Sequence, residues 1–118
     1  MKFSMTLLAI LLPGMLSVGH ASTASIQAHV LNTLLADQDR WGGCMAKLSK
    51  PIASVGVDCP GEWVSFSCSG IFTRKEIAYR MFDTAQLALT KNYQIAIYVD
   101  DTQKHNGYCY ANRIDLVK

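Results

Sequence analysis

The residues best able to do chemistry in this chain gather near its C-terminal end. The stretch DDTQKHNGYCYANRID, residues 100–115, places carboxylates, a lysine and a histidine around an Asn-Gly pair, next to a cysteine and two tyrosines. Carboxylates accept hydrogen bonds, histidine titrates near neutral pH, and tyrosine rings stack on flat ligand faces. The cluster is either a site or a turn between two strands, and the surrounding elements decide between these interpretations.

Catalytic interpretations of this cluster are weak. His105 could exchange protons beside Asp100 or Asp101, but no serine of the chain lies in a nucleophile-elbow sequence. A glycosidase needs two carboxylates across a cleft, which so small a chain rarely provides. The EF-hand spacing is absent around Asp100, Asp101 and Asp115, and no Cys-x-x-Cys pair is present. We therefore expect a protein that is not an enzyme and that uses no metal and no cofactor.

The first residues are typical of an export signal. Lys2 supplies a positive start, residues 5–12 (MTLLAILL) form a short apolar run, and small residues end the segment at Ala21. We expect cleavage after Ala21, with Ala24 as the second position, so that residues 1–21 are a signal peptide and residues 22–118 form one domain. A buried N-terminal helix or a membrane anchor is the alternative. No later segment has the ~20 apolar residues of a transmembrane helix, so we expect a secreted or periplasmic protein.

The clearest structural element is a helix over residues 73–91. Thr73 and Glu76 have the spacing of a capping box, in which each side chain bonds the other residue's backbone N–H. Asn92 suits a left-handed stop at the other end. An apolar face at helical spacing carries Ile77, Ala78, Met81, Phe82, Ala85, Ala88 and Leu89.

Strands are expected on both sides of this helix. Alternating apolar and polar residues predict strands over residues 63–68 and 94–100, and the Asn-Gly pair predicts a hairpin leading into a strand over 108–117. Residues 44–48 form a short strand, and residues 25–35 favour a strand over a helix.

Three strands, one helix and two strands is the chain order of the OB-fold, a small Greek-key barrel. The sequence therefore predicts a mainly β protein with one helix, folded as an OB-fold-like five-stranded barrel. An open α+β sheet with the helix packed on one face is the alternative.

The four cysteines predict two disulfides, because an exported chain meets oxidising conditions. Cys59 and Cys68 lie mostly along one strand, so they should be too far apart to bond. Of the two connectivities left we favour Cys44–Cys68 with Cys59–Cys109. A hairpin centred near residues 55–57 puts Cys44 opposite Cys68, and a closed barrel brings together the starts of its third and fifth strands, near the other two cysteines.

Charge argues against one class of partner. The chain has 11 Lys and Arg against 9 Asp and Glu, a formal net charge of +2, without a basic run or an acidic tail. Strong binding to nucleic acid needs many phosphate contacts. Nucleic acid is therefore not an expected partner.

Three stretches carry a resemblance to known proteins: CPGEWVSFSC, AQLALTKNYQIAIYVDD and GYCYANRIDL. With these the chain resembles a group of small exported bacterial proteins of largely unknown function, which is similar in arrangement to the B subunits of AB5-type toxins, the subtilase-cytotoxin B kind in particular. The likeness covers most of the expected mature chain as a pattern. It implies an OB-fold, and it implies glycan binding by a pentameric ring, without identifying sugar-contacting residues here.

In an OB-fold the loops that join strands one to two and four to five flank one binding face. Here these loops are residues 36–41 and 101–107, and both carry carboxylates able to accept hydrogen bonds from sugar hydroxyls. The candidate ligand-binding residues are Asp39, Trp41, Asp101, Lys104, His105, Tyr108 and Tyr110. The alternative is a solvated hairpin loop in which Asp and Asn serve turn geometry and Tyr110 packs in the barrel.

Two functions from different classes follow. The first is an exported, non-catalytic binding module that recognises a glycan or a partner protein through these two loops. Such a module could form a homo-oligomeric ring, which needs contacts between its subunits. Leu87, which lies off the apolar helix face, is a candidate for such a contact. The second is an accessory or structural periplasmic protein without a small-molecule site.

Overall fold

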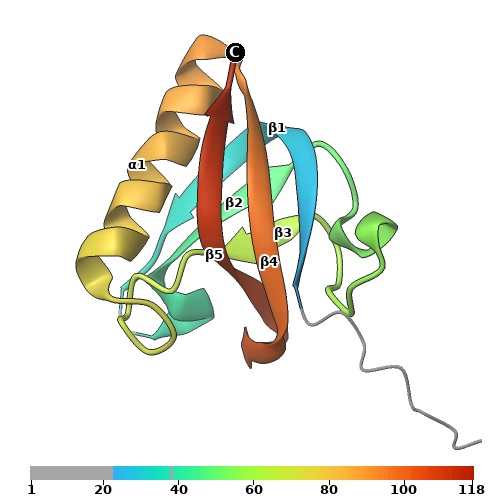
Figure 1. Ribbon diagram of the computed structural model, residues 1–118. Helices are drawn as coiled ribbons and strands as arrows, with labels where there is room; N and C mark the ends of the chain where they lie inside the picture. Colours follow the sequence, from blue (N-terminus) through green and yellow to red (C-terminus); the bar gives the residue numbers. More distant parts are fainter. Residues whose placement is uncertain (1–22, 38) are drawn as a thin grey trace, which may run out of the picture.

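The computed structural model describes residues 23–37 and 39–118 (Figure 1). The expected signal peptide, residues 1–21, lies outside the described residues. Within them, no helix is both long and apolar enough to cross a membrane. In chain order the elements are β1 (Thr23–Leu35), the 3₁₀ turn η1 (Arg40–Gly43), β2 (Cys44–Leu48), the 3₁₀ turn η2 (Ile52–Val55), β3 (Trp63–Ser65), α1 (Lys75–Lys91), β4 (Gln94–His105) and β5 (Tyr108–Val117).

The five strands close into a barrel with the order β1-β2-β3-β5-β4. The first strand closes it by pairing antiparallel with β4 along residues 23–29 and with β2 along residues 30–35, where the register shifts between Val30 and Asn32. Strands β3 and β5 run parallel, with Ser65 opposite Tyr110. This arrangement confirms the predicted OB-fold-like barrel.

The strand predictions hold in most places. Both β2 and β5 have their predicted bounds, and β1 is a strand because its alternate residues Ile26, Ala28 and Val30 all enter the core. Two bounds differ. The third strand ends at Ser65 because Ser67 turns the chain with a φ of 59°, and β4 continues to His105.

Helix α1 packs along one side of the barrel (Figure 1) and buries a face rich in alanine. The buried residues are Ala78, Met81, Phe82, Ala85 and Ala88. The predicted apolar face was too wide, because Ile77 is 42% and Leu89 38% exposed. Leu87 is also exposed, as expected.

The predicted capping box is wrong, whereas the predicted helix stop is confirmed. The N-cap is Arg74, in an extended conformation and without a side-chain cap bond, so the helix begins after Thr73. The preceding Phe72 packs on the rings of His105 and Tyr110. At the other end Asn92 adopts the left-handed conformation, with a φ of 55°.

Both predicted disulfides are present: Cys44–Cys68 and Cys59–Cys109, each with a Cα–Cα distance of 5.6 Å. The register expected for the first was two residues off, since the Phe66 N–H donates to the Cys44 carbonyl and Phe66 therefore lies opposite Cys44. The turn at Ser67 brings Cys68 back onto Cys44. The second bridge forms where predicted, ahead of β3 and at the start of β5.

Removing a disulfide is expected to lower the free energy of unfolding by about 3–4 kcal/mol in the chain-entropy model. The bridges join residues 24 and 50 positions apart, so the pair Cys59→Ser/Cys109→Ser should cost slightly more than Cys44→Ser/Cys68→Ser. Replacing both partners avoids a reactive free thiol. Urea unfolding followed by circular dichroism measures the change, and a midpoint equal to that of the wild type would contradict the stabilising role.

Candidate functional site

The two loops expected to flank one face are in direct contact. The backbone N–H of Trp41, in η1, donates to Oδ1 of Asn106, in the turn between β4 and β5, at 2.8 Å. The carbonyl of Trp41 accepts from Oγ of Ser65, at the end of β3, at 2.7 Å. The N-terminal end of α1 lies at this same end of the barrel (Figure 1). The peptide groups of Trp41 are therefore held by two other segments of the fold.

Trp41 itself has a strained backbone. Its φ of 51° and ψ of 28° lie in the left-handed region, and Gly42 and Gly43 continue with φ of 73° and 90°. A left-handed conformation costs a residue with a side chain roughly 1–2 kcal/mol, and it is a genuine outlier for a bulky one. Strain of this kind tends to lie at functional sites, where the surrounding structure enforces it. The strain therefore marks the Trp41 ring as a candidate functional group.

A buried polar cluster supports the turn from below. Nε2 of His105 lies 2.9 Å from Oγ of Ser67, which also accepts from the Phe72 N–H at 3.0 Å. The imidazole is only 6% exposed, and its centroid lies 4.3 Å from that of the Phe72 ring. A serine beside a histidine has the parts of a nucleophile and base, but Ser67 is fully buried. Since no substrate reaches that hydroxyl, the pair is structural.

Burial also sets the charge state of this cluster. It lowers the pKa of His105 from its ordinary value of 6.5, and the nearby Asp39 carboxylate opposes part of that shift. Gly42 packs directly on the imidazole, so a Cβ atom there would lie 2.6 Å from its Cδ2 atom and would also collide with Oγ of Ser65. The neutral imidazole is therefore a packing surface for the turn that carries Trp41.

Beside this turn lies an apolar groove of about 230 Å³, here called the aromatic groove. Its lining comes from four strands and η1: Leu34, Trp41, Met45, Trp63 and Tyr108. Met45 is only 2% exposed although it lies outside the main core cluster, so these neighbours cover it. Trp63 is the residue that the sequence interpretation missed. Its signal was the alternation with Val64, which points inward and leaves Trp63 on the outer face.

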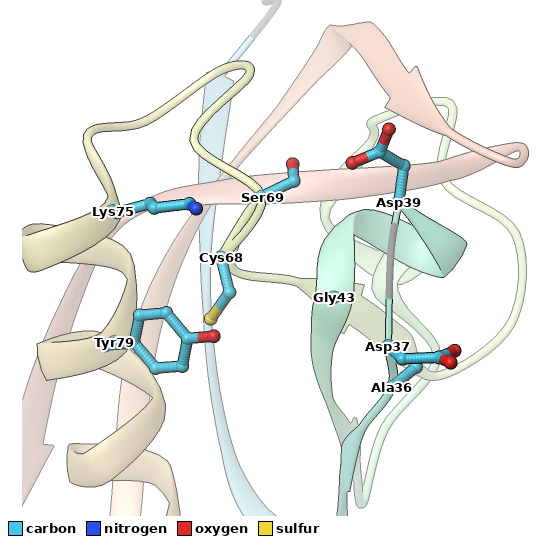
Figure 2. A pocket seen from close by; sticks show the side chains of 8 residues that line it. All are labelled: Ala36, Asp37, Asp39, Gly43, Cys68, Ser69, Lys75 and Tyr79. Carbon is cyan, nitrogen blue, oxygen red and sulfur yellow. The ribbon is translucent and has the colours of Figure 1, made fainter.

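A second groove, of about 290 Å³, lies between the same turn and the start of α1 and is here called the polar groove (Figure 2). Its lining residues are Ala36, Asp37, Asp39, Gly43, Cys68, Ser69, Lys75 and Tyr79. It contains two carboxylates and one ammonium group. Within residues 23–37 and 39–118, no group of three or more His, Cys, Asp or Glu side chains could hold a metal ion.

The predicted site residues fall into four places. Trp41 and Tyr108 line the aromatic groove, and Asp39 lines the polar groove. His105 and Tyr110 contact Phe72 beneath the turn, where burial and the Asp100 carboxylate raise the pKa of Tyr110.

The fourth place is the segment before β3, which Asp101 and Lys104 hold in position. The Asp58 N–H donates to Oδ2 of Asp101 at 3.0 Å, and Nζ of Lys104 forms a 3.1 Å ion pair with the Asp58 carboxylate. The predicted loop 101–107 is therefore wrong as a loop. It is strand up to a tight turn at Asn106 and Gly107, with an irregular register between Asp100 and Lys104.

Comparison of the chain with protein families, with characterised proteins and with solved structures finds no match. The function must therefore be inferred from the two grooves.

Replacing Gly42 tests the close approach beneath Trp41. Gly42→Ala adds a methyl group against His105 and Ser65, whereas the matched Gly107→Ala has the same type of backbone strain, at a φ of 89°, with nothing within 4 Å. We expect Gly42→Ala to lower the free energy of unfolding by about 1–3 kcal/mol more than Gly107→Ala, the usual cost of overpacking. Chemical denaturation measures both, and equal losses would show that the contact is unimportant.

The buried imidazole is expected to make stability depend on pH. Because the folded-state pKa of His105 lies below 6.5, the unfolded chain takes up a proton first as the pH falls. The contribution of the neutral His105 to the free energy of unfolding is complete above pH 6.5. It is lost as the pH falls through the folded-state pKa of His105. His105→Gln should therefore lose less stability than the wild type between about pH 7.5 and about pH 5. Parallel slopes of unfolding free energy against pH in the two proteins would contradict this assignment.

Proposed function

We propose that this protein is an exported, non-catalytic binding module that recognises a glycan through the aromatic groove. The observation that carries the proposal is Trp41, whose ring lines this groove although its backbone is strained. A glycine at this position would carry no such cost. The tryptophan is therefore best explained by what its side chain does at the surface.

The composition of the groove suits a sugar. Trp41, Trp63 and Tyr108 offer rings that stack against the apolar C–H face of a pyranose, while the Tyr108 hydroxyl can bond its polar edge. Aromatic side chains have few rotatable bonds, so they lose little entropy on binding. The hydrogen bonds that Asn106 and Ser65 form with the Trp41 peptide groups hold the turn that carries the ring in place before the ligand binds. This reduces the entropic cost of ordering the turn on binding.

Export and assembly are further parts of the proposal. Disulfides persist in oxidising compartments, and the two disulfides of this chain close on buried cysteines. The pattern likeness to B subunits of AB5-type toxins points in the same direction, because members of that group bind glycans as rings. Leu87, which is 45% exposed on α1, is the candidate contact between subunits of such a ring.

A partner protein is the second candidate. Leu34 and Met45 make part of the groove aliphatic, which favours an apolar side chain of a partner over a polar sugar edge. A glycan and a partner protein would both contact the rings of Trp41, Trp63 and Tyr108. The accessory periplasmic protein without a small-molecule site remains the competing function, and it assigns no ligand to the groove.

A glycan array with the full chain tests the proposal. We expect wild-type binding, and Trp63→Ala and Trp41→Ala should each weaken it tenfold or more, which corresponds to about 1.4 kcal/mol of lost stacking. Leu116→Ala, near the other end of β5 from Tyr108, is the control for an exposed apolar residue outside the groove. Thermal melting of each variant separates lost binding from unfolding.

Two outcomes would contradict the proposal. A wild-type protein that binds no glycan, measured alongside its mass by size-exclusion light scattering, would favour a protein partner or an accessory role. Full binding by both tryptophan variants would place the site elsewhere.

A further inference from the structure

The turn η1 borders both grooves. Asp39 and Trp41 are two positions apart, yet the first lines the polar groove and the second the aromatic groove. The two grooves are therefore neighbours, and a ligand bound in one of them lies next to the other. Since the aromatic groove has about 230 Å³, below the usual range of small-molecule pockets, a larger ligand would extend beyond it.

The helix side of the polar groove carries hydrogen-bond donors. Lys75 and Tyr79 are four positions apart on α1, so they lie on one face of the helix. In Figure 2 the ammonium and the phenol hydroxyl both point away from the helix, toward the segment from Ala36 to Gly43. The Lys75 side chain packs against Gly70, where a Cβ atom would lie 3.2 Å from its Cγ atom, and this contact steers the ammonium into the groove.

The opposite side carries hydrogen-bond acceptors that no described residue neutralises. Asp39 precedes η1 without making a side-chain cap bond. Among residues 23–37 and 39–118 the ion pairs are Lys104–Asp58 and Arg113–Asp115, so Asp37, Asp39 and Lys75 take part in none. The groove therefore presents unpaired carboxylates across from an unpaired ammonium.

The floor between these sides is rigid. The Ala36 N–H donates to the Gly43 carbonyl at 2.8 Å, and the Ser69 N–H donates to the Gly42 carbonyl at 2.9 Å. The Cys44–Cys68 disulfide lies beneath both bonds. Oγ of Ser69 is buried and has no hydrogen-bond partner among the residues that the structure describes, so its capacity to donate or accept is unmet there.

We propose that the polar groove is a second subsite, which binds a neutral, hydroxyl-rich sugar residue of the same glycan that the aromatic groove holds. The assignment rests on the proposed function. Each sugar hydroxyl both donates and accepts, so one ring can donate to the carboxylates of Asp37 and Asp39 and accept from Lys75 and Tyr79. Because the groove holds two carboxylates and only one ammonium, an acidic sugar would meet net repulsion.

Chemical-shift mapping on the uniformly ¹⁵N-labelled protein tests the two grooves separately. The amides of Gly43, Ser69 and Lys75 report on the polar groove, and those of Met45 and Trp63 with the tryptophan indole N–H groups report on the aromatic groove. The probes are glucose, galactose, mannose and N-acetylglucosamine, the disaccharides built from them, and glucuronic acid as the acidic sugar. We expect the best disaccharide to shift both sets of signals, and to bind more tightly than either of its monosaccharides.

Two variants isolate the second subsite. Asp39→Asn and Tyr79→Phe each remove one polar partner and should weaken binding of the disaccharide threefold to tenfold. The chemical-shift changes that a monosaccharide causes in the aromatic set should be the same in both variants as in the wild type. Asp83→Asn, on an exposed position of α1 outside the groove, is the matched control and should bind as the wild type does.

The outcomes separate the two proposals. Disaccharide shifts confined to the aromatic set, or unchanged affinity in both variants, would overturn the second subsite and leave the proposed function standing. Shifts confined to the polar set would overturn the aromatic groove as the primary site. Tighter binding of glucuronic acid, or shifts of the polar set by free amino acids such as glycine but by no sugar, would overturn the assignment of a neutral sugar.

Discussion

The close packing of the Gly42 backbone on His105 and Ser65 is the constraint on which the grooved end of this molecule depends. It lets the turn between β1 and β2 lie flat on the end of β4, where Asn106 and Ser65 can hold both peptide groups of Trp41. Without that approach the turn would move outward, and the tryptophan would lose its support. A buried histidine is well suited to the position, since it is flat, neutral and still able to bond Ser67.

The disulfides let a small barrel maintain this strained end. A domain of this size buries only about 60–70% of the surface that its unfolded chain exposes, so its core leaves little stability to spare. One bridge lies directly under η1 and the other ties the start of β5 to the segment before β3. Asp101 and Lys104 add polar contacts to the second of these junctions. The cross-links thus hold in place the segments from which both grooves are built.

The two grooves give the η1 turn a double role. Its strained tryptophan lines an apolar groove and Asp39 lines a polar one, an arrangement suited to a ligand with an apolar face and many hydroxyls. The same turn rests on the interior through Gly42, so the geometry of both grooves is set by one buried cluster. Preorganisation of this kind matters most for weak ligands such as sugars, whose few contacts leave little free energy to order a loop.

The sequence by itself determined the barrel order, the positions of β2 and β5, the helix stop at Asn92 and the pairing of the cysteines, because these follow from local periodicity, turn residues and chain geometry. The way in which Cys68 reaches Cys44, through the turn at Ser67, was decided only by the tertiary structure. It also proposed Trp41, Asp39 and Tyr108 as site residues in or beside the loops of the OB-fold, and the structure places them in the linings of the two grooves. Only the tertiary structure decided that His105 is buried, that Asp101 and Lys104 contact Asp58, and that Trp63 joins the groove. Those features depend on contacts between segments tens of residues apart, which a local pattern does not encode. The tertiary structure also decided the start of the helix, whose N-cap is Arg74 and not the expected Thr73.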